Sequence, residues 1–253
     1  MLKQICSILL AASCAYGALS LLAGQPSPSV QPAYRINADD FDAFWIWGNI
    51  QSAPYLSKAK ELYILQGEVQ IHPYRKQSAF IPQGVQVLTI PHQKVWLVFR
   101  NHHLNWRGSE LQQILQRVQQ WEKAGNHVQG IQIDFDAKTQ NLHAYALFLA
   151  QLRQQLPKKY QLSITGLMDW SNMQDAQTLQ LFRHNINEII VQTYQGSSTI
   201  PYYEAYLHKI SQLKLPYKIG AVQGGKWNPA LNFRHDPNFK GMVIFLLRGQ
   251  AKT

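Results

Sequence analysis

The segment Gly-Ile-Gln-Ile-Asp-Phe-Asp at residues 130–136 lies in a short apolar run between two helical patterns. The run is too short for a helix, so it predicts a buried strand that ends in polar residues. The first helical pattern spans about 109–123 and the second about 141–156, and Gly125 and Pro157 end them. A strand between two helices is the repeating unit of a parallel α/β sheet.

The same alternation of short apolar runs and helical patterns continues along the chain from residue 39. Eight strands are predicted, at residues 43–47, 61–71, 94–100, 128–135, 161–167, 188–193, 217–222 and 241–247. Two more helices are predicted at about 175–184 and 202–213, and a small hairpin is expected at 85–90. Eight strands in a chain of 253 residues predict a (β/α)8 TIM-type barrel. Because the chain stops soon after residue 247, the last helix is expected to be missing or replaced by the N-terminal region.

The N-terminal segment has the composition of an export signal. One lysine precedes an apolar stretch that runs to about Gly24, and a Pro-rich polar break follows. Residues 1–24 therefore predict a signal peptide or, as an apolar helix long enough to cross a bilayer, a membrane anchor. Lipidation of Cys14 is a third alternative and a buried helix of the domain a fourth; an uncleaved or lipidated segment makes the membrane a partner. Residues 25–38 are expected to be a linker and residues 39–253 the barrel, in an exported protein that is periplasmic or membrane-anchored in the cell envelope.

Composition limits the partners and the chemistry. The chain is 46% hydrophobic with a formal net charge of +10, but its basic residues are scattered and form no stripe, so nucleic acid is not a predicted partner. Both cysteines, Cys6 and Cys14, lie in the N-terminal segment, so the folded domain has no disulfide and no thiolate metal site. The nine histidines are spread along the chain, and there is no Gly-x-Ser-x-Gly motif. No metal and no organic cofactor is predicted.

Two carboxylates at the end of the 130–136 strand are the strongest candidates for chemistry. Side chains alternate along a strand, so Gln132, Asp134 and Asp136 are expected on one face, at the mouth of the barrel. Neighbouring carboxylates disturb each other's titration, and one keeps its proton to higher pH, as the general acid of a glycosidase must. Two alternatives stay open, in which Asp136 caps the next helix or Asp134 makes a structural salt bridge.

Polar and aromatic residues follow several other predicted strands, as a sugar-binding mouth requires. Carboxylates and amides bind sugar hydroxyls, and flat rings stack on the apolar faces of pyranoses. The candidates for substrate binding, besides Gln132, are Trp47, Arg100, Asp169, Trp170, Gln192 and Gln223, and Tyr194 is the third candidate for catalysis. A place in the core is an equal alternative for Trp47 and Trp170.

The 130–136 motif resembles the strand-four signature of the family 18 glycoside hydrolases, the chitinase-like barrels, whose pattern is Gly-x-Asp-x-Asp-x-Glu. Here Gln132 replaces the first Asp and Asp136 replaces the Glu, while Asp134 is kept. Tyr194 resembles the tyrosine of strand six in those barrels, which assists the acetamido group of the substrate.

A closer resemblance is to a bacterial family, domain of unknown function 3142. The segments that carry this resemblance are residues 62–68, 132–136, 145–156 and 162–170. The likeness covers most of residues 40–248. It implies a barrel of the glycosidase superfamily and leaves the activity open.

Two functions are consistent with these residues. The first is hydrolysis of an envelope or extracellular polysaccharide or oligosaccharide, with Asp136 as general acid and Asp134 as its electrostatic partner. In this case Tyr194 and Gln192 position the substrate, and Asp169 is available as a second carboxylate. The alternative is a non-catalytic sugar-binding or scaffolding barrel. Asp is one methylene shorter than Glu, which sets the acid back by about 1–1.5 Å and can cost roughly a hundredfold in rate.

Overall fold

The computed structural model describes residues 34–48 and 57–247. The chain divides into one unit at Met1–Pro32 and a second at Ala33–Thr253, which holds all the described residues. The predicted signal peptide or anchor at residues 1–24 therefore lies outside the described residues, together with both cysteines.

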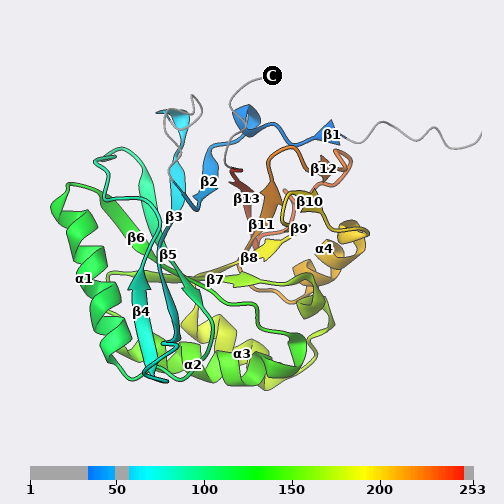
Figure 1. Cartoon of the computed structure of the whole chain (residues 1–253). Coiled ribbons are helices and arrows are strands. Elements are labelled where there is room, and N and C mark those ends of the chain that lie inside the picture. Colours follow the sequence, from blue (N-terminus) through cyan, green and yellow to red (C-terminus); the bar gives the residue numbers. More distant parts are fainter. Residues whose placement is uncertain (1–33, 49–56, 248–253) are drawn as a thin grey trace, which may run out of the picture. The chain divides into compact units, whose positions relative to one another are not determined.

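Eight parallel strands form a closed barrel in the second unit (Figure 1). They are β2 (Ala43–Ile46), β3 (Glu61–Ile71), β5 (Lys94–Asn101), β6 (His127–Asp134), β7 (Gln161–Gly166), β8 (Glu188–Gln192), β11 (Tyr217–Val222) and β13 (Phe239–Phe245). Each strand pairs in parallel with its neighbours, and β2 pairs with both β3 and β13, which closes the sheet. The predicted TIM-type barrel is confirmed, with each strand within two residues of its predicted bounds.

In residues 34–48 and 57–247, four α-helices pack on the outside of the barrel (Figure 1). They are α1 (Ser109–Lys123), α2 (Leu142–Gln155), α3 (Ala176–Asn185) and α4 (Tyr203–Gln212), and they follow β5, β6, β7 and β8. Each buries one apolar face, because its apolar residues recur at helical spacing. In α1 the buried apolar side chains are Leu111, Ile114, Val118 and Trp121. They belong to the core layer between sheet and helices that also contains the outward-facing Ile131 and Ile133 of β6.

Among the connections that the structure describes in full, two depart from the regular repeat. After β3 the chain turns back as β4 (Ser78–Pro82), which pairs antiparallel with β3, so the hairpin predicted at 85–90 is wrong. Residues 85–90 are held instead by the Asn126 side chain, which donates to Leu88 O and accepts from Ile90 N. The connection from β11 to β13, all of whose residues are described, contains the short strand β12 (Lys226–Trp227) and no α-helix.

Residues 34–38, expected to end the linker, are attached to the barrel unit. The short strand β1 (Tyr34–Arg35) pairs antiparallel with β12. Ile36 N donates to Gly225 O at 2.9 Å, and Ile36 O accepts from Gly224 N at 2.8 Å. Ile36 is buried, and the 3-10 turn η1 (Ala38–Asp40) follows. The folded unit therefore begins before residue 39.

The interior of the barrel contains a chain of buried polar side chains. Trp45 Nε1 donates to Gln132 Oε1 at 2.6 Å, and the Gln132 amide donates to Ser163 Oγ at 2.9 Å. The Ser163 hydroxyl in turn donates to Glu188 Oε1 at 3.0 Å. Gln132, Ser163 and Glu188 thus each have a hydrogen-bond partner in the barrel, as a low-dielectric interior requires.

An ion cluster continues this chain at the N-terminal end of the barrel. Lys218 Nζ lies 2.5 Å from Glu61 Oε2 and 3.2 Å from Glu188 Oε2. It also donates to the Tyr63 hydroxyl at 2.7 Å, and Tyr63 donates to Glu188 at 2.6 Å. Trp96 Nε1 donates to the other oxygen of Glu61 at 2.7 Å. Burial and the two carboxylates raise the pKa of Tyr63 well above its usual value, so the phenol stays neutral and donates.

Gly130 is required by the close approach of β6 to β7. A Cβ at this position would lie 2.1 Å from the carbonyl oxygen of Gln161, its neighbour across the ladder. Since backbone atoms cannot move aside as a flexible side chain can, Gly130→Ala is expected to lower the free energy of unfolding by about 1–3 kcal/mol. Urea unfolding measures this loss, with Gln129→Ala as the neighbouring control. An unchanged midpoint for Gly130→Ala would contradict the assigned strand pairing.

Candidate active site

The C-terminal ends of the parallel strands meet at one end of the barrel, as α/β-barrel active sites require. Asp134 is the last residue of β6, Gln192 is the last of β8, and Arg100 is the last but one of β5. Trp47 follows β2 directly, and Gln223 follows β11. The strand register brings β5 and β6 together with Arg100 opposite Asp134. This end of the barrel therefore brings together a cation, a carboxylate and an aromatic ring.

Asp134 is a buried carboxyl group, with only 4% of its surface exposed. Its Oδ1 accepts a hydrogen bond from Thr165 Oγ1 at 2.9 Å, and Thr165 also accepts from the Phe135 amide at 3.2 Å. Burial raises the pKa of Asp134 to about 6, against the lowering effect of the Thr165 hydrogen bond. The charge of Asp136 raises this pKa further, while Arg100 lowers it.

Asp136 lies two residues beyond the end of β6 and is exposed. It does not cap the next helix, because the N-cap of η3 (Thr139–Asn141) is Lys138 and that of α2 is Asn141. Its charge acts on Asp134 and Tyr194, which places the three groups in electrostatic range. The alternative of a structural salt bridge also fails for Asp134, whose hydrogen-bond partner among the described residues is the Thr165 hydroxyl.

Tyr194 is half-buried at the mouth, in the short strand β9 (Tyr194–Gln195). Its ring stacks on Phe245 with centroids 5.4 Å apart, and meets Trp45 edge-on at 6.5 Å. Burial raises its pKa well above the usual value, and so do the charges of Asp134 and Asp136. The phenol is therefore neutral and its hydroxyl is a hydrogen-bond donor.

Trp47 extends this group of rings. It packs edge-on against Phe245 at 5.6 Å, and the Arg100 guanidinium lies 5.3 Å from its ring centroid. Trp47, Tyr194 and Phe245 are each partly exposed. Phe245 was not among the sequence candidates, because it reads as an ordinary apolar residue of the last strand.

Three sequence candidates lie away from an open mouth. Gln132 is fully buried and uses its amide to join Trp45 and Ser163. Trp170 is also fully buried, so of its two predicted alternatives it takes the place in the core and not the one at the mouth. Its Nε1 donates to Ala137 O at 2.7 Å, and its ring stacks on Phe182 at 5.3 Å in the layer beneath the helices.

The third is Asp169, which belongs to η4 (Met168–Asn172) and is tied to the loop after β6. Its Oδ2 accepts from Thr139 N at 2.9 Å and from Thr139 Oγ1 at 2.7 Å. These bonds join the loops that follow β6 and β7, the first of which carries Asp136. Asp169 therefore supports the Asp136 loop. Gln192 and Gln223 are half-buried at their strand ends, and the side-chain oxygen of Gln223 has no hydrogen-bond partner among the described residues.

The raised pKa of Asp134 makes the stability of the fold depend on pH. Below about pH 4 the carboxyl is protonated in both the folded and the unfolded chain, so its ionisation does not change the free energy of unfolding. Between about pH 4 and 6 the unfolded chain ionises first, so stability falls as pH rises. Above pH 6 the free energy of unfolding is lowered by the full amount, on the order of 3 kcal/mol, because the pKa moves from 3.8 to about 6 on folding.

Asp134→Asn is therefore expected to raise the free energy of unfolding by about 1–3 kcal/mol at pH 8, with little change at pH 4. The Asn oxygen can still accept the Thr165 hydrogen bond, so packing is preserved. Guanidinium unfolding at both pH values measures the effect, with Glu204→Gln on α4 as the surface control. Equal destabilisation at both pH values would show that Asp134 is not a strained buried acid.

Within residues 34–48 and 57–247 there is no group of three or more His, Asp or Glu side chains that could hold a metal ion. No helix in these ranges has the length and apolar character needed to cross a bilayer.

The fold and the acidic mouth define an α/β barrel with a carboxylate-bearing C-terminal face. Within this class, residues 104–212 match the family described as Domain of unknown function (DUF3142), which confirms the resemblance seen in the sequence. A search of curated protein sequences gives no significant match.

Solved structures with a similar arrangement of strands include three distant proteins. The spore cortex-lytic enzyme SleL of Bacillus cereus is 14% identical with a TM-score of 0.45, over 71% of this chain and 51% of that one. The chitinase domain of the spore coat protein CotE of Clostridium difficile is 12% identical with a TM-score of 0.47, over 76% and 66%. Concanavalin B is 11% identical with a TM-score of 0.48, over 83% and 94%. The chain thus spans about half the length of the SleL structure that it matches.

Proposed function

We propose that this protein hydrolyses glycosidic bonds of an envelope or extracellular glycan by carboxylate acid catalysis. One observation carries the proposal: a buried carboxyl with a pKa of about 6, Asp134, lies in electrostatic contact with an exposed carboxyl, Asp136, at the mouth of the barrel. Below about pH 6 Asp134 holds its proton, and the exposed carboxyl of Asp136 follows it two residues along the chain. An acid in this state is suited to protonating a glycosidic oxygen.

Within the pair, Asp136 is the group that meets the substrate, because it is exposed and Asp134 is not. The proton held by Asp134 passes through Asp136 to the glycosidic oxygen as the bond from that oxygen to the anomeric carbon breaks. Water supplies the hydroxyl of the new reducing end and returns a proton to the pair. Burial keeps the proton on Asp134 up to about pH 6, and Thr165 holds Asp134 in place.

The half-buried rings of the mouth are suited to holding a sugar. Trp47 and Tyr194 present partly exposed aromatic surface beside the two carboxylates, and the neutral Tyr194 hydroxyl donates a hydrogen bond. Arg100 and Gln192 supply further polar groups at adjacent strand ends. We propose no substrate contact for Gln132 and Trp170, because neither is exposed.

The proposed site of action is outside the cytoplasm. This part of the proposal rests on residues 1–24, whose charged start, apolar stretch and Pro-rich break are those of an export signal. Export followed by cleavage gives a periplasmic protein, while retention or lipidation at Cys14 gives a membrane-anchored one.

A second candidate is a sugar-binding barrel without turnover. The short side chain of Asp136 and the burial of Asp134 favour it, since both move a proton donor away from a bound glycan. The two candidates separate when purified full-length protein is incubated with a panel of bacterial envelope glycans and exopolysaccharides. Release of new reducing ends from a glycan supports the hydrolase. Retention of a glycan without release supports the binding barrel. If no glycan of the panel is either cleaved or bound, both proposed functions are overturned.

A further inference from the structure

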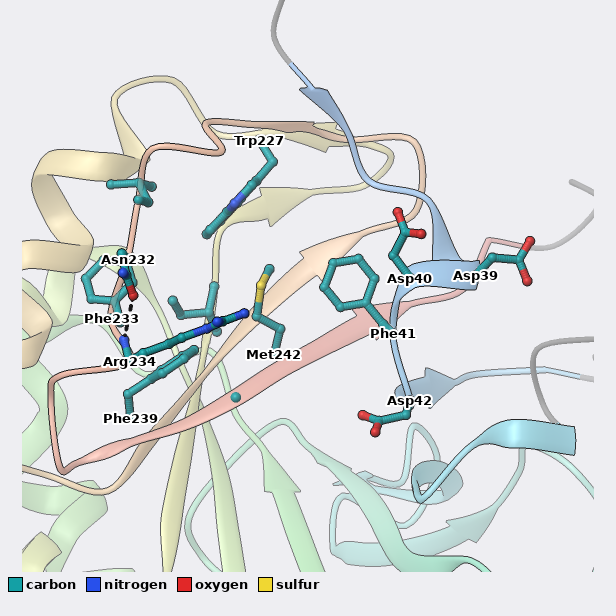
Figure 2. A pocket seen from close by; sticks show the side chains of 13 residues that line it. Asp39, Asp40, Phe41, Asp42, Trp227, Asn232, Phe233, Arg234, Phe239 and Met242 are labelled. Atoms are coloured by element: carbon teal, nitrogen blue, oxygen red, sulfur yellow. Dashed lines mark hydrogen bonds between the residues drawn. The ribbon is translucent and has the colours of Figure 1, made fainter.

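A cavity of about 440 Å³ lies on the outer face of β11 and β13, apart from the barrel mouth (Figure 2). Its wall includes Ile219 of β11 and Met242 of β13, both of which belong to the outward-facing side of the sheet. The β11–β13 connection covers this face with a loop, where the preceding units place a helix. The volume falls in the range of about 300–1,000 Å³ that is usual for small-molecule sites.

The lining of the cavity is amphiphilic. Phe41 and Phe239 are partly exposed rings, and Met242 adds a further apolar surface. Figure 2 shows Arg234 extending beside the Phe239 ring toward Met242, with Phe41 facing it from the η1 side. Among the described residues no carboxylate lies within 4.0 Å of the Arg234 guanidinium, so its donors are available to a ligand. The Asn232 oxygen accepts from Arg234 N at 3.0 Å, which leaves the amide NH2 to donate.

The charges around the cavity balance one another. Its rim carries three carboxylates, those of Asp39, Asp40 and Asp42. Lys58 lies 3.4 Å from Asp39, and Lys60 lies 2.7 Å from Asp42. Together with Arg234 of the lining, these two lysines, which lie beside the lining acids, equal the three acids in number, although the whole chain has a net charge of +10. A balanced rim favours a neutral ligand over an ion of either sign.

We infer that this cavity binds a pyranose unit of a neutral glycan, at a second site outside the barrel mouth. A pyranose has apolar C–H faces, which Phe41, Phe239 and Met242 accept, and a rim of hydroxyls, which planar polar groups bind. The Arg234 guanidinium and the Asn232 amide are such groups, and both sit on the wall of the cavity. The inference goes beyond the proposed function, because it requires no cleavage at Asp134 and Asp136.

Methionine methyl groups offer a direct test. The chain has four methionines, of which Met242 lines the cavity while Met168 and Met173 are buried elsewhere. The full-length protein is labelled with 13C at the methionine methyls, and Met242→Leu assigns the reporter signal. Hexamers of glucose, mannose and N-acetylglucosamine are the neutral probes, and a galacturonic acid hexamer is the charged one.

A neutral hexamer is expected to shift the Met242 methyl to saturation and to leave Met173 in place. Arg234→Ala is expected to weaken this binding by about tenfold or more, from the loss of charge-assisted hydrogen bonds. Arg107→Ala, another exposed arginine, serves as the matched control and is expected to bind as the wild type does. Phe41→Ala is the second variant, and a weaker Met242 response is expected there too.

Three outcomes would overturn the inference: no Met242 shift with any neutral hexamer, a shift with the charged hexamer alone, or equal affinity after Arg234→Ala. A Met242 shift in a protein that cleaves no glycan would support the second site while removing the proposed hydrolase. Cleavage of a glycan without a Met242 shift would support the proposed hydrolase and overturn the second site.

Discussion

Replacing Asp136 with Asn is expected to slow glycan hydrolysis by about 10²–10⁴-fold, the usual contribution of a general acid. The amide has nearly the same shape as the carboxyl but holds no transferable proton. Because Asp136 is exposed and lies past the end of β6, the change should leave folding intact. The measurement is the initial rate of reducing-end release from the best glycan of the panel, together with the affinity for that glycan.

Two controls make this result specific. Glu204→Gln makes the same chemical change on α4, at a residue with no proposed role in the site, and is expected to keep the wild-type rate. The second control is an unchanged melting temperature of Asp136→Asn. If Asp136→Asn hydrolyses the glycan as fast as the wild type, the acid is another residue and the assignment of Asp136 fails.

Replacing Lys218 with Met is expected to lower the free energy of unfolding by about 3–5 kcal/mol. The lysine lies 2.5 Å from Glu61 and 3.2 Å from Glu188 inside the barrel, and its removal leaves both carboxylates without their cation. For a domain of this size the loss corresponds to a melting temperature lower by roughly 6–20 °C. Differential scanning calorimetry measures it.

A combined variant separates loss of charge balance from loss of packing. Changing Glu61 and Glu188 to Gln in the Lys218→Met background removes the uncompensated charges, and part of the stability should return. Lys209→Met, an exposed lysine on α4, is expected to change stability by no more than about 0.5 kcal/mol. If Lys218→Met were as stable as the wild type, the ion cluster would contribute nothing to the fold.

The barrel could be predicted because its signals are local. Continuous apolar strands such as β5 and β11 alternate with helices whose apolar residues recur at helical spacing. The hairpin at 85–90 was predicted wrongly because the bonds of Asn126 to that segment join residues more than thirty positions apart. The pattern of apolar residues over a short stretch of sequence does not indicate hydrogen bonds between residues so far apart.

The candidate site could be predicted only in part, since polarity at a strand end does not distinguish a mouth from a closed interior. Asp134 and Gln132 both point inward from β6, but Gln132 lies one step deeper and is fully bonded there. Trp170 follows β7 yet turns under α3 to stack on Phe182. Burial depends on neighbours brought in by other elements, which the local sequence does not specify.

The inward orientation of two polar residues of β7 could have been predicted from the sequence. Ser163 and Thr165 are polar residues at alternate positions of an otherwise apolar strand, which predicts that both point into the barrel. They bind Gln132 and Asp134 there. The Lys218 cluster had no such signal, because its members come from three strands that are far apart in the sequence.

The central claim is that a proton held by the Asp134–Asp136 pair drives hydrolysis at the barrel mouth. It is tested most directly by the initial rate of reducing-end release from one glycan, measured across the pH range around the pKa of Asp134, which is about 6. The rate is predicted to be high on the acidic side and to fall as the pH rises through about 6, because the pair loses its proton there. A rate that stays constant or increases through this range would contradict the claim.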